Sequence, residues 1–475
     1  MNALEWTRPV WGGVALGVAL SLGGCVGLSK DAGHAGVAAD VAARLDKRVT
    51  WARSDGEQAG IRRAVAELLA QPLSADDAVQ IALLNNRGLQ ALYGELGIAE
   101  TDVVQAGRIA NPRFSTTRTR SSESFKYETS LTFPILGLLT MPQALKMERR
   151  RFETVKLQVT DRILQLAAET RRAYVDAVAA DASVHYLAQV QDAADAGAEL
   201  AQRMAAKGNV PQLERLREQA FSADTGMQRV KAESAATAAR ERLTRLMGLG
   251  VDGASFQLPE RLPDLPTEAA ELKDLETFAM ARRLDVAAAK RDVESTAASL
   301  GLTRTTRFIN ALEVGPATLL EHGEQSRKGY EISVELPLFD WGGSRVARAE
   351  SMYRQAVDRV ADVAVQARSD VRERYALYRD AWTIAKRYRD EIVPLRRRIA
   401  DEHLLRYNGM LIGVFELLAD AREQVAAANG YLRAVRDYWV AEADLRQALG
   451  GRLPAAPIVP LPSDAPAPVR PSSKG

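Results

Sequence analysis

Two ten-residue segments, 125–134 and 328–337, alternate apolar and polar residues with the period of a β-strand that has one apolar face. The Tyr-Glu pair and the closing proline of the first segment recur 203 positions later in the second. This repetition predicts two copies of one strand. The apolar face expected from the pattern consists of Tyr127, Leu131, Phe133, Tyr330, Ile332, Val334 and Leu336.

Each of these strands leads into a helical pattern that is much longer than an ordinary domain needs. The segment Gln143–Lys207 contains no proline and one glycine, which predicts a helix of ~65 residues, about 97 Å long. After the second strand we expect a similar helix over Ser344–Tyr407, kinked at Pro394. Helices of this length need continuous lateral partners.

Gly-containing reversals end both long helices, and each reversal leads into a shorter return helix, expected at 212–247 in the first case. Weaker patterns predict two more strands, at 113–120 and about 307–314, with a loop over 315–329. The order helix, two strands, long helix, turn and shorter helix thus occurs twice. The expected divisions are a signal peptide at 1–24, an N-terminal leader or equatorial segment at 25–72, a first strand–helix repeat at 73–250, a Pro-rich connector at 251–266, a second strand–helix repeat at 267–452 and a disordered Pro-rich tail at 453–475.

Four short strands cannot close a membrane barrel, because the smallest such barrels have about eight strands. Unpaired backbone groups in lipid cost several kcal/mol each, so strands in a bilayer require oligomerisation, and three chains supply twelve strands. The expected fold is therefore mainly α with a membrane β-barrel, continued by four helical columns per chain. Two columns are the long helices. The others are expected to stack end to end, 212–247 with 267–302 and the N-terminal helix with the C-terminal one. The alternative is a soluble sandwich or hairpin packed on helices.

The N-terminus predicts secretion. An apolar run over Val10–Leu22 suits a signal peptide, and Leu22-Gly-Gly-Cys25 resembles a bacterial lipobox in which Cys25 is lipidated. An ordinary signal peptide with an incidental cysteine is the alternative. Val26 after the cysteine favours the outer membrane. The net charge of +2, from 63 basic and 61 acidic residues, argues against a nucleic-acid partner.

The segment Leu336-Pro-Leu-Phe-Asp-Trp-Gly-Gly343, the duplication, the lipobox and the glycine turns resemble the TolC-like outer-membrane efflux proteins, specifically their lipoprotein branch. The resemblance covers about residues 73 to 450 and implies a TolC-like trimeric α/β-barrel. The first copy, Phe133–Thr140, lacks the Asp and the double Gly. The strand-to-helix joints expected from the resemblance contain Pro134, Pro337, Asp340, Trp341, Gly342 and Gly343.

The resemblance implies a homotrimeric exit duct that docks, through a periplasmic adaptor, on an inner-membrane pump. It also implies a periplasmic gate, in which Tyr407 forms a link and Glu416 contributes to a ring of carboxylates. Asp420 is a second candidate for this ring, because Ala419 occupies the second ring position. An ordinary exposed helix residue is the alternative for Glu416. The reversals are expected to contact the adaptor through Gly208, Val210, Pro211, Gly409, Met410, Leu411, Ile412 and Gly413.

The leading hypothesis is thus a passive outer-membrane channel of a tripartite efflux pump, lipid-anchored and extending into the periplasm. A protein-secretion duct and a non-conducting periplasmic coiled-coil lipoprotein are the alternatives. We expect no enzyme activity and no cofactor. The four histidines are scattered singly, so no metal site is expected. Drugs, metal ions, metabolites and proteins all remain open as cargo.

Overall fold

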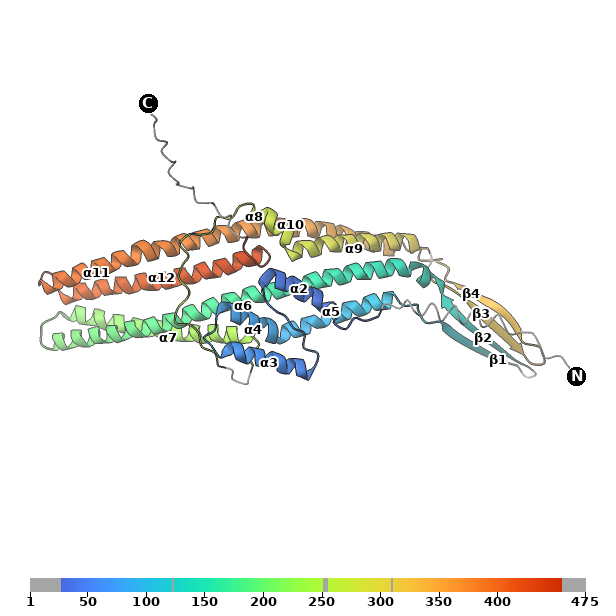
Figure 1. Cartoon of the computed structure of the whole chain (residues 1–475), viewed down its shortest axis with the longest axis horizontal. Coiled ribbons are helices and arrows are strands. Elements are labelled where there is room, and N and C mark those ends of the chain that lie inside the picture. Colours follow the sequence, from blue (N-terminus) through green and yellow to red (C-terminus); the bar gives the residue numbers. More distant parts are fainter. Residues whose placement is uncertain (1–26, 122–123, 251–254, 309–310, 455–475) are drawn as a thin grey trace, which may run out of the picture.

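The computed structural model describes residues 27–121, 124–250, 255–308 and 311–454. The signal peptide, Cys25 and nearly all of the tail lie outside these residues. The molecule is elongated, with a β-sheet at one end and helices running from it to two hairpin tips at the other end (Figure 1). Among the described helices, none combines the length and the apolar character required to cross a membrane.

The predicted leader contains two helices, and the predicted repeats contain the other elements. In chain order the elements are α2 His34–Leu45, α3 Asp55–Leu69, α4 Ala75–Asn85, α5 Arg87–Ala106, β1 Arg113–Arg120, β2 Phe125–Pro134, α6 Ile135–Ala206, α7 Gln212–Leu246, α8 Leu275–Arg282, α9 Leu284–Thr306, β3 Leu312–Glu321, β4 Arg327–Val334, α10 Gly343–Arg387, the π-helical turn η2 Tyr388–Ile392, α11 Val393–Asn408 and α12 Val414–Ala448.

The four strands form one antiparallel sheet in the order β1-β2-β3-β4. β1 and β2 occupy the predicted segments. The prediction for β3 is wrong: this strand runs over Leu312–Glu321, most of which was expected to be loop. Gly315 and Pro316 disfavour a central strand, since proline has no N–H to donate to the ladder. The β2–β3 ladder is interrupted opposite these two residues and continues on both sides.

The long helices are confirmed. α6 contains 72 residues, which corresponds to about 108 Å. It begins directly after β2 and includes Pro142, whereas the prediction started it at Gln143. The second long helix is interrupted close to Pro394, as predicted, but the interruption is a π-helical turn between α10 and α11.

The shorter helices stack end to end within each repeat, so both predicted pairings, 212–247 with 267–302 and the N-terminal helix with the C-terminal one, are wrong. α7 ends against the break between α4 and α5, where Asn85 Nδ2 donates to the carbonyl oxygens of Met247 and Gly248 at 3.2 and 2.8 Å. Gly248 adopts φ +66°, and a Cβ on it would lie 2.5 Å from the Asn85 carbonyl oxygen. Only glycine fits this close approach.

α12 ends in the same way against the break between α8 and α9. Arg44 Nη1 donates to the carbonyl oxygens of Arg282 and Gly450, at 2.8 and 3.4 Å. The two breaks are alike in backbone conformation, with φ −66°, ψ 119° at Asn86 and φ −65°, ψ 128° at Arg283. Each glycine turn therefore returns the chain to the broken helix of its own repeat.

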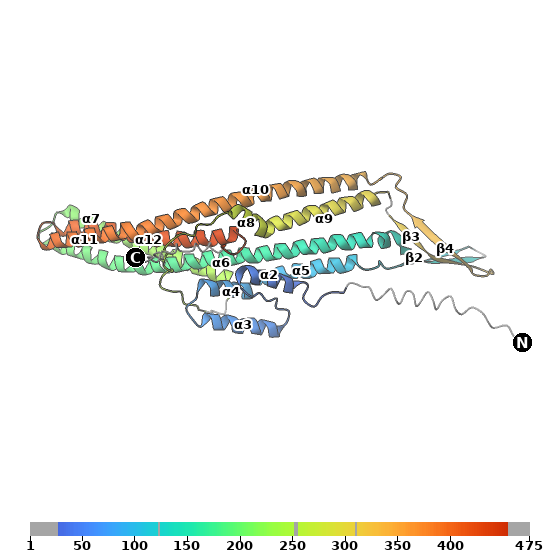
Figure 2. The ribbon, with the colours of Figure 1, turned by 45° about the horizontal axis from the view of Figure 1, so that its top comes forward.

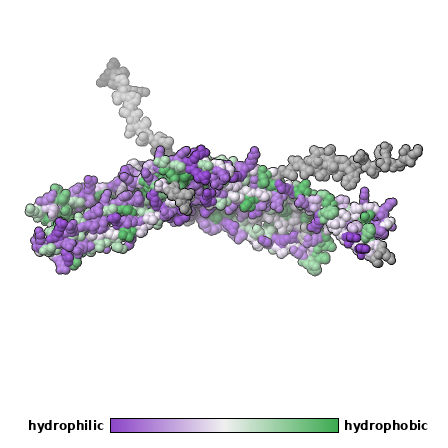
Figure 3. All heavy atoms as spheres, turned by 90° about the horizontal axis from the view of Figure 1, so that it is seen from below, coloured by the Kyte–Doolittle hydropathy of each residue, from purple (hydrophilic) through white to green (hydrophobic). Residues whose placement is uncertain are grey.

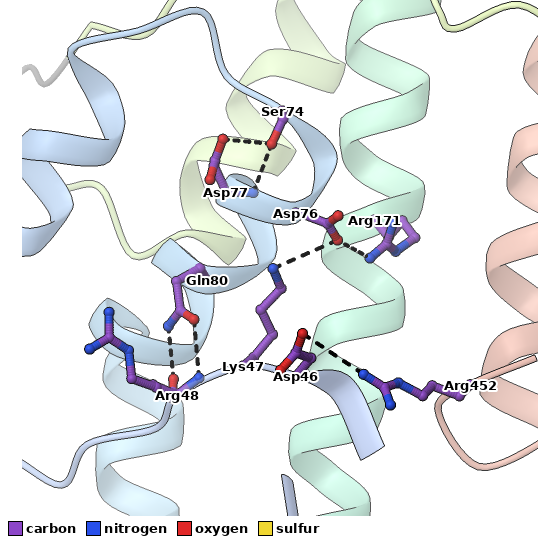
Figure 4. A network of polar contacts seen from close by, with 9 residues as sticks. All are labelled: Asp46, Lys47, Arg48, Ser74, Asp76, Asp77, Gln80, Arg171 and Arg452. Atoms are coloured by element: carbon purple, nitrogen blue, oxygen red, sulfur yellow. Dashed lines mark hydrogen bonds and ion pairs between the residues drawn. The ribbon is translucent and has the colours of Figure 1, made fainter. Parts of the chain in front are cut away.

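The hydrophobic core lies at mid-length, where α2, α3 and α4 pack beside α6 and the ends of α7 and α12 (Figures 1 and 2). A polar network fastens the N-terminal segment there (Figure 4). Asp76 of α4 pairs with Arg171 of α6 at 2.6 Å and with Lys47 at 3.8 Å, and Asp46 lies 3.9 Å from Arg452 near the C-terminus.

Candidate transport pathway, gate and docking tips

One face of the sheet carries apolar side chains from all four strands, together with Arg118 of β1 and Lys328 of β4. Phe114 pairs with Leu131, Phe133 pairs with Val314, and Val314 pairs with Ile332. Directly paired residues point to the same side of a sheet, so these side chains form continuous rows. The predicted membrane-face residues that lie within strands all belong to this face: Tyr127, Leu131, Phe133, Tyr330, Ile332 and Val334.

The apolar face is exposed in the single chain. Tyr330 is 78% exposed and Ile332 57%, and Leu336, which lies beyond the end of β4, is 68% exposed. Hydrophobic side chains are prominent where the sheet meets the helices, whereas polar ones dominate the middle of the helical part (Figure 3). An apolar surface of this kind requires a cover, either lipid or protein.

The opposite face of the sheet is polar. Thr132 is buried and donates its hydroxyl to Glu313 at 2.9 Å, and Arg113 lies 3.6 Å from the same carboxylate. Glu128 pairs with Lys126 at 2.6 Å on this face. The two faces of the sheet therefore differ sharply in polarity.

The two strand-to-helix joints differ, as the sequence indicates. In the first repeat Pro134 ends β2 and α6 begins at the next residue. In the second repeat the chain leaves β4 at Val334 and turns before α10. The Asp340 carboxylate accepts the Gly342 N–H at 2.8 Å, and Gly342 adopts φ +74° with its Cα packed against the carbonyl of Arg307. This turn leaves Leu338, Phe339 and Trp341 exposed.

The first helix of each hairpin ends in the same turn, which is closed by an N–H that donates to the carbonyl five residues earlier. In the first tip Asn209 N–H donates to the Met204 carbonyl, and Gly208 adopts φ +74°. In the second tip Leu411 N–H donates to the Arg406 carbonyl, and Met410 adopts φ +59°. This is the Schellman motif, whose left-handed position usually holds glycine.

The structural counterpart of Gly208 is thus Met410, 202 positions later, and not Gly409, whose φ is −77°. The turns at Gly248 and Gly450 show the same offset. Met410 and Leu411 are 93% and 77% exposed at the very end of the molecule. The two tips lie at the same end, so one surface can contact both (Figure 2).

The predicted gate residues do not share one environment. Glu416 is exposed and Tyr407 is 39% exposed, on the second hairpin near its tip. Asp420 is only 7% exposed, and its Oδ2 lies 3.8 Å from His403 Nδ1 within the same hairpin. In this chain Glu416 projects into solvent, whereas Asp420 lies inside the hairpin.

A buried ion pair that the sequence reasoning missed joins the two repeats close to the tips. Glu218 of α7 is 3% exposed and accepts a hydrogen bond from Arg422 Nη2 of α12 at 2.5 Å. Arg422 also lies over the Phe221 ring at 4.7 Å. With the repeat offset of 202, Glu218 is the counterpart of Asp420. The two return helices therefore carry a buried acid at the same position.

A polar cavity of about 120 Å³ lies at mid-length between α6, α9, α10 and α12. Asp444 is bound there by Arg172 and by Arg374, the latter at 2.7 Å. Asp161 accepts a hydrogen bond from Gln165 at 2.7 Å. Burial, and then the nearby Asp285 carboxylate, raise the pKa of Asp161. Among the described residues, no group of three or more His, Cys, Asp and Glu side chains has the arrangement of a metal site.

The family model described as Outer membrane efflux protein matches residues 78–249. The cobalt-zinc-cadmium resistance protein CzcC of Cupriavidus metallidurans is 24% identical over 279 residues, which cover 57% of this chain and 64% of CzcC. The match thus spans less than two thirds of that relative.

Solved structures share the fold. The CmeC outer membrane channel of Campylobacter jejuni gives a TM-score of 0.68 at 16% identity, over 79% of this chain and 85% of CmeC. The MtrE outer membrane channel of Neisseria gonorrhoeae gives 0.63 at 18% identity, over 79% of this chain and 88% of MtrE. Together with the family match, these likenesses confirm the resemblance that the duplicated strands and turns predict.

Proposed function

We propose that this chain, which resembles the TolC-like outer-membrane efflux proteins in sequence and fold, is the outer-membrane component of a tripartite efflux pump. It acts as a passive exit duct for small molecules or ions, without enzyme activity. The observation that carries the proposal is the sheet: one largely apolar face, one polar face, and a helix about 108 Å long attached to it.

Within the described residues, β1 pairs only with β2 and β4 only with β3, so the sheet has two open edges. An open edge in lipid is costly because its backbone groups have no water to bind. Joining β4 of one chain to β1 of the next in a trimer removes all edges and gives twelve strands. The apolar face then meets lipid and the polar face lines the duct.

Disulfide cross-linking tests this closure. A cysteine at Thr117 in β1 is combined in turn with one at Gly329, Glu331 or Ser333 in β4. Within one chain β1 and β4 are separated by two strands, about 14 Å, which is too far for a disulfide. Oxidised outer membranes should therefore yield covalent trimers for at least one pair. Thr117 combined with Ile332, on opposite faces, is the control. Monomers from every same-face pair would refute closure through these edges.

The hairpin tips are proposed to contact a periplasmic adaptor that leads to an inner-membrane pump. The exposed apolar Met410 and Leu411 support this assignment, since solvent alone does not favour them at a turn. We expect Leu411→Asp to abolish efflux without lowering the yield of trimer, while Lys207→Asp, beside the polar first tip, has a smaller effect. Normal efflux by Leu411→Asp would rule out docking through this tip.

At the tip end, Glu416 is the proposed ring acid, with one carboxylate from each chain, and Tyr407 a proposed link. Asp420 is the weaker ring candidate because it faces His403 inside the hairpin. Three Glu416 side chains favour cations. The similarity to CzcC, which is named for resistance to cobalt, zinc and cadmium, makes these divalent cations the first cargo to test.

The proposed outer-membrane location includes a lipid anchor at Cys25. Labelled palmitate should be incorporated into the wild-type protein and not into Cys25→Ser. Two or more acyl chains suffice for stable anchoring. The Cys25→Ser variant lacks them and depends on its strands alone for attachment to the membrane.

A further inference from the structure

Charged side chains are distributed unequally between the two faces of the sheet. All acidic residues within the four strands lie on the polar face: Glu128 in β2, Glu313 and Glu321 in β3, and Glu331 in β4. On the apolar face, Arg118 and Lys328 are joined by Arg120, which pairs with Phe125. Within the strands, the charges of the apolar face are therefore all positive.

The cations of the two faces also differ in their partners. On the polar face each lies beside a carboxylate: Lys126 beside Glu128 at 2.6 Å, Arg113 beside Glu313 at 3.6 Å and Arg327 beside Glu324 at 3.4 Å. Arg118 instead lies over the Tyr127 ring, 5.4 Å from its centroid. In the part of the chain that the structure describes, Arg118, Arg120 and Lys328 form no ion pair with a carboxylate. The apolar face thus presents three exposed positive charges that the chain does not neutralise.

These cations lie at the end of the sheet that is farthest from the helices. The rows next to the helices carry aliphatic and aromatic side chains. The next row contains Lys328 together with Thr116, Thr129 and Thr318. Arg118 and Arg120 follow in the two rows beyond it, towards the β-hairpin turns that end the sheet (Figure 1). The face therefore changes from apolar to cationic along its length.

The position of these charges fits a membrane boundary. A lysine or arginine on the lipid face of a membrane strand is strongly unfavourable at the bilayer midplane and nearly neutral at its surface. In the proposed trimer this face meets lipid, so the three cations lie at the level of the headgroups. Because the helices extend into the periplasm, this level belongs to the outer leaflet.

The chemistry of the three side chains favours a phosphate. The planar guanidinium of an arginine donates two parallel hydrogen bonds to phosphate oxygens, and a lysine ammonium adds a compact positive charge. A boundary that met only neutral or zwitterionic headgroups would not require a face without any carboxylate. The sign of the charges therefore selects an anionic headgroup.

We propose that Arg118, Arg120 and Lys328 bind the phosphate groups of anionic lipids in the outer leaflet, while the acyl chains lie on the apolar rows. The inference rests on the proposed function, because it takes the sheet to lie in a membrane. Within one chain Lys328 and Arg118 are separated by two strands. Joining β4 to β1 of the next chain brings them onto adjacent strands, so each junction of the trimer forms one such site.

Native mass spectrometry of detergent-solubilised trimers tests the site. The ligands are phosphatidic acid and phosphatidylcholine with the same acyl chains, so that they differ in headgroup alone. The parent is compared with two double variants. One combines Arg118→Gln with Lys328→Gln on the apolar face, and its control combines Arg113→Gln with Lys126→Gln on the polar face. Both variants lose the same charge.

Each cation near a membrane surface strengthens the binding of an anionic lipid by about fivefold. We therefore expect the parent to prefer phosphatidic acid by about tenfold or more. The apolar-face variant should lose this preference by at least about fivefold, and the polar-face variant should keep it.

A parent without a preference for phosphatidic acid would overturn the proposal, even if a variant does not assemble. An apolar-face variant that keeps the preference would also overturn it, and so would an equal loss in the polar-face variant. Conductance tests the duct separately. Trimers that bind phosphatidic acid as expected and do not conduct refute the duct alone, whereas conducting trimers without the preference refute only the lipid site.

Discussion

The two repeats are built to one plan and differ in how their parts are held. Their return helices, α7 and α12, both contain 35 residues and are offset by 202 positions. The first repeat has an uninterrupted long helix and a direct strand-to-helix joint. The second has a π turn, a structured joint at Asp340–Gly343 and a tip with a strained methionine. The two repeats thus share their arrangement of helices and strands, and the second differs at the joint, in the long helix and at the tip.

The largest effects of substitution are expected where each repeat closes on its broken helix. Gly248→Ala places a Cβ 2.5 Å from the Asn85 carbonyl oxygen, whereas Gly450→Ala places one 3.2 Å from that of Arg282. Both also force alanine into a left-handed conformation. We expect losses of about 4 kcal/mol for Gly248→Ala and about 2 kcal/mol for Gly450→Ala. Thermal unfolding followed by circular dichroism should rank them in this order, and a greater loss at Gly450 would contradict the packing described.

The equivalent buried acids should differ as well. Glu218→Gln leaves Arg422 without its carboxylate partner, and we expect a cost of about 3 kcal/mol. Asp420→Asn is the matched isosteric change in the second repeat. It removes a buried carboxylate whose Oδ2 has no hydrogen-bond partner among the described residues. Its effect on unfolding should be close to zero. Similar losses in the two variants would show that the acids have equivalent roles.

The left-handed position of each tip allows a pair of opposite substitutions, at Met410 and at Gly208. Met410→Gly relieves the left-handed methionine and should raise the free energy of unfolding by about 1 kcal/mol. Gly208→Ala introduces the corresponding strain in the first tip and should lower it by about 1 kcal/mol. Chemical denaturation of both variants tests the pair. If Met410→Gly brings no gain, the strain at the second tip is compensated by contacts within the hairpin.

The smallest effect concerns pH at the mid-length cavity, where Asp444 has two arginine partners and Asp161 has none as close. Because its pKa is raised in the folded state, Asp161 binds its proton more tightly there than in the unfolded chain. Its contribution is therefore favourable at low pH and is lost as pH rises from the ordinary value of an aspartate through the raised one. Asp161→Asn should raise the melting temperature at pH 7 and give no gain at pH 3. A gain that is independent of pH would point to packing instead.

Elements whose formation depends on local sequence were predicted well. Strict alternation located β2, and a long stretch without proline located most of α6. Non-local features were less accessible. Gly315 and Pro316 favour a loop locally, yet both pair with β4, and β3 pairs with β2 before and after them. The stacking of α7 on the α4–α5 break depends on Asn85 meeting a turn 163 positions away, which no local pattern indicates.

The candidate site shows the same division. The apolar face of the sheet and the two tips follow from local periodicity and turn residues. The Glu218–Arg422 pair joins residues 204 positions apart, so no local pattern indicates it. The offset that aligns the strands is 203, but the one that aligns the turns is 202. The offset thus changes by one residue between strand and tip, which makes Met410 and not Gly409 the counterpart of Gly208.

The most direct test of the central claim is the conductance of purified trimers in planar lipid bilayers. A passive duct lined by Glu416 predicts discrete, cation-selective single-channel steps, and Glu416→Gln should reduce the cation selectivity while leaving insertion unchanged. Trimers that insert stably and show no conductance, under any voltage or salt at which the bilayer survives, would contradict the account and favour a periplasmic scaffold.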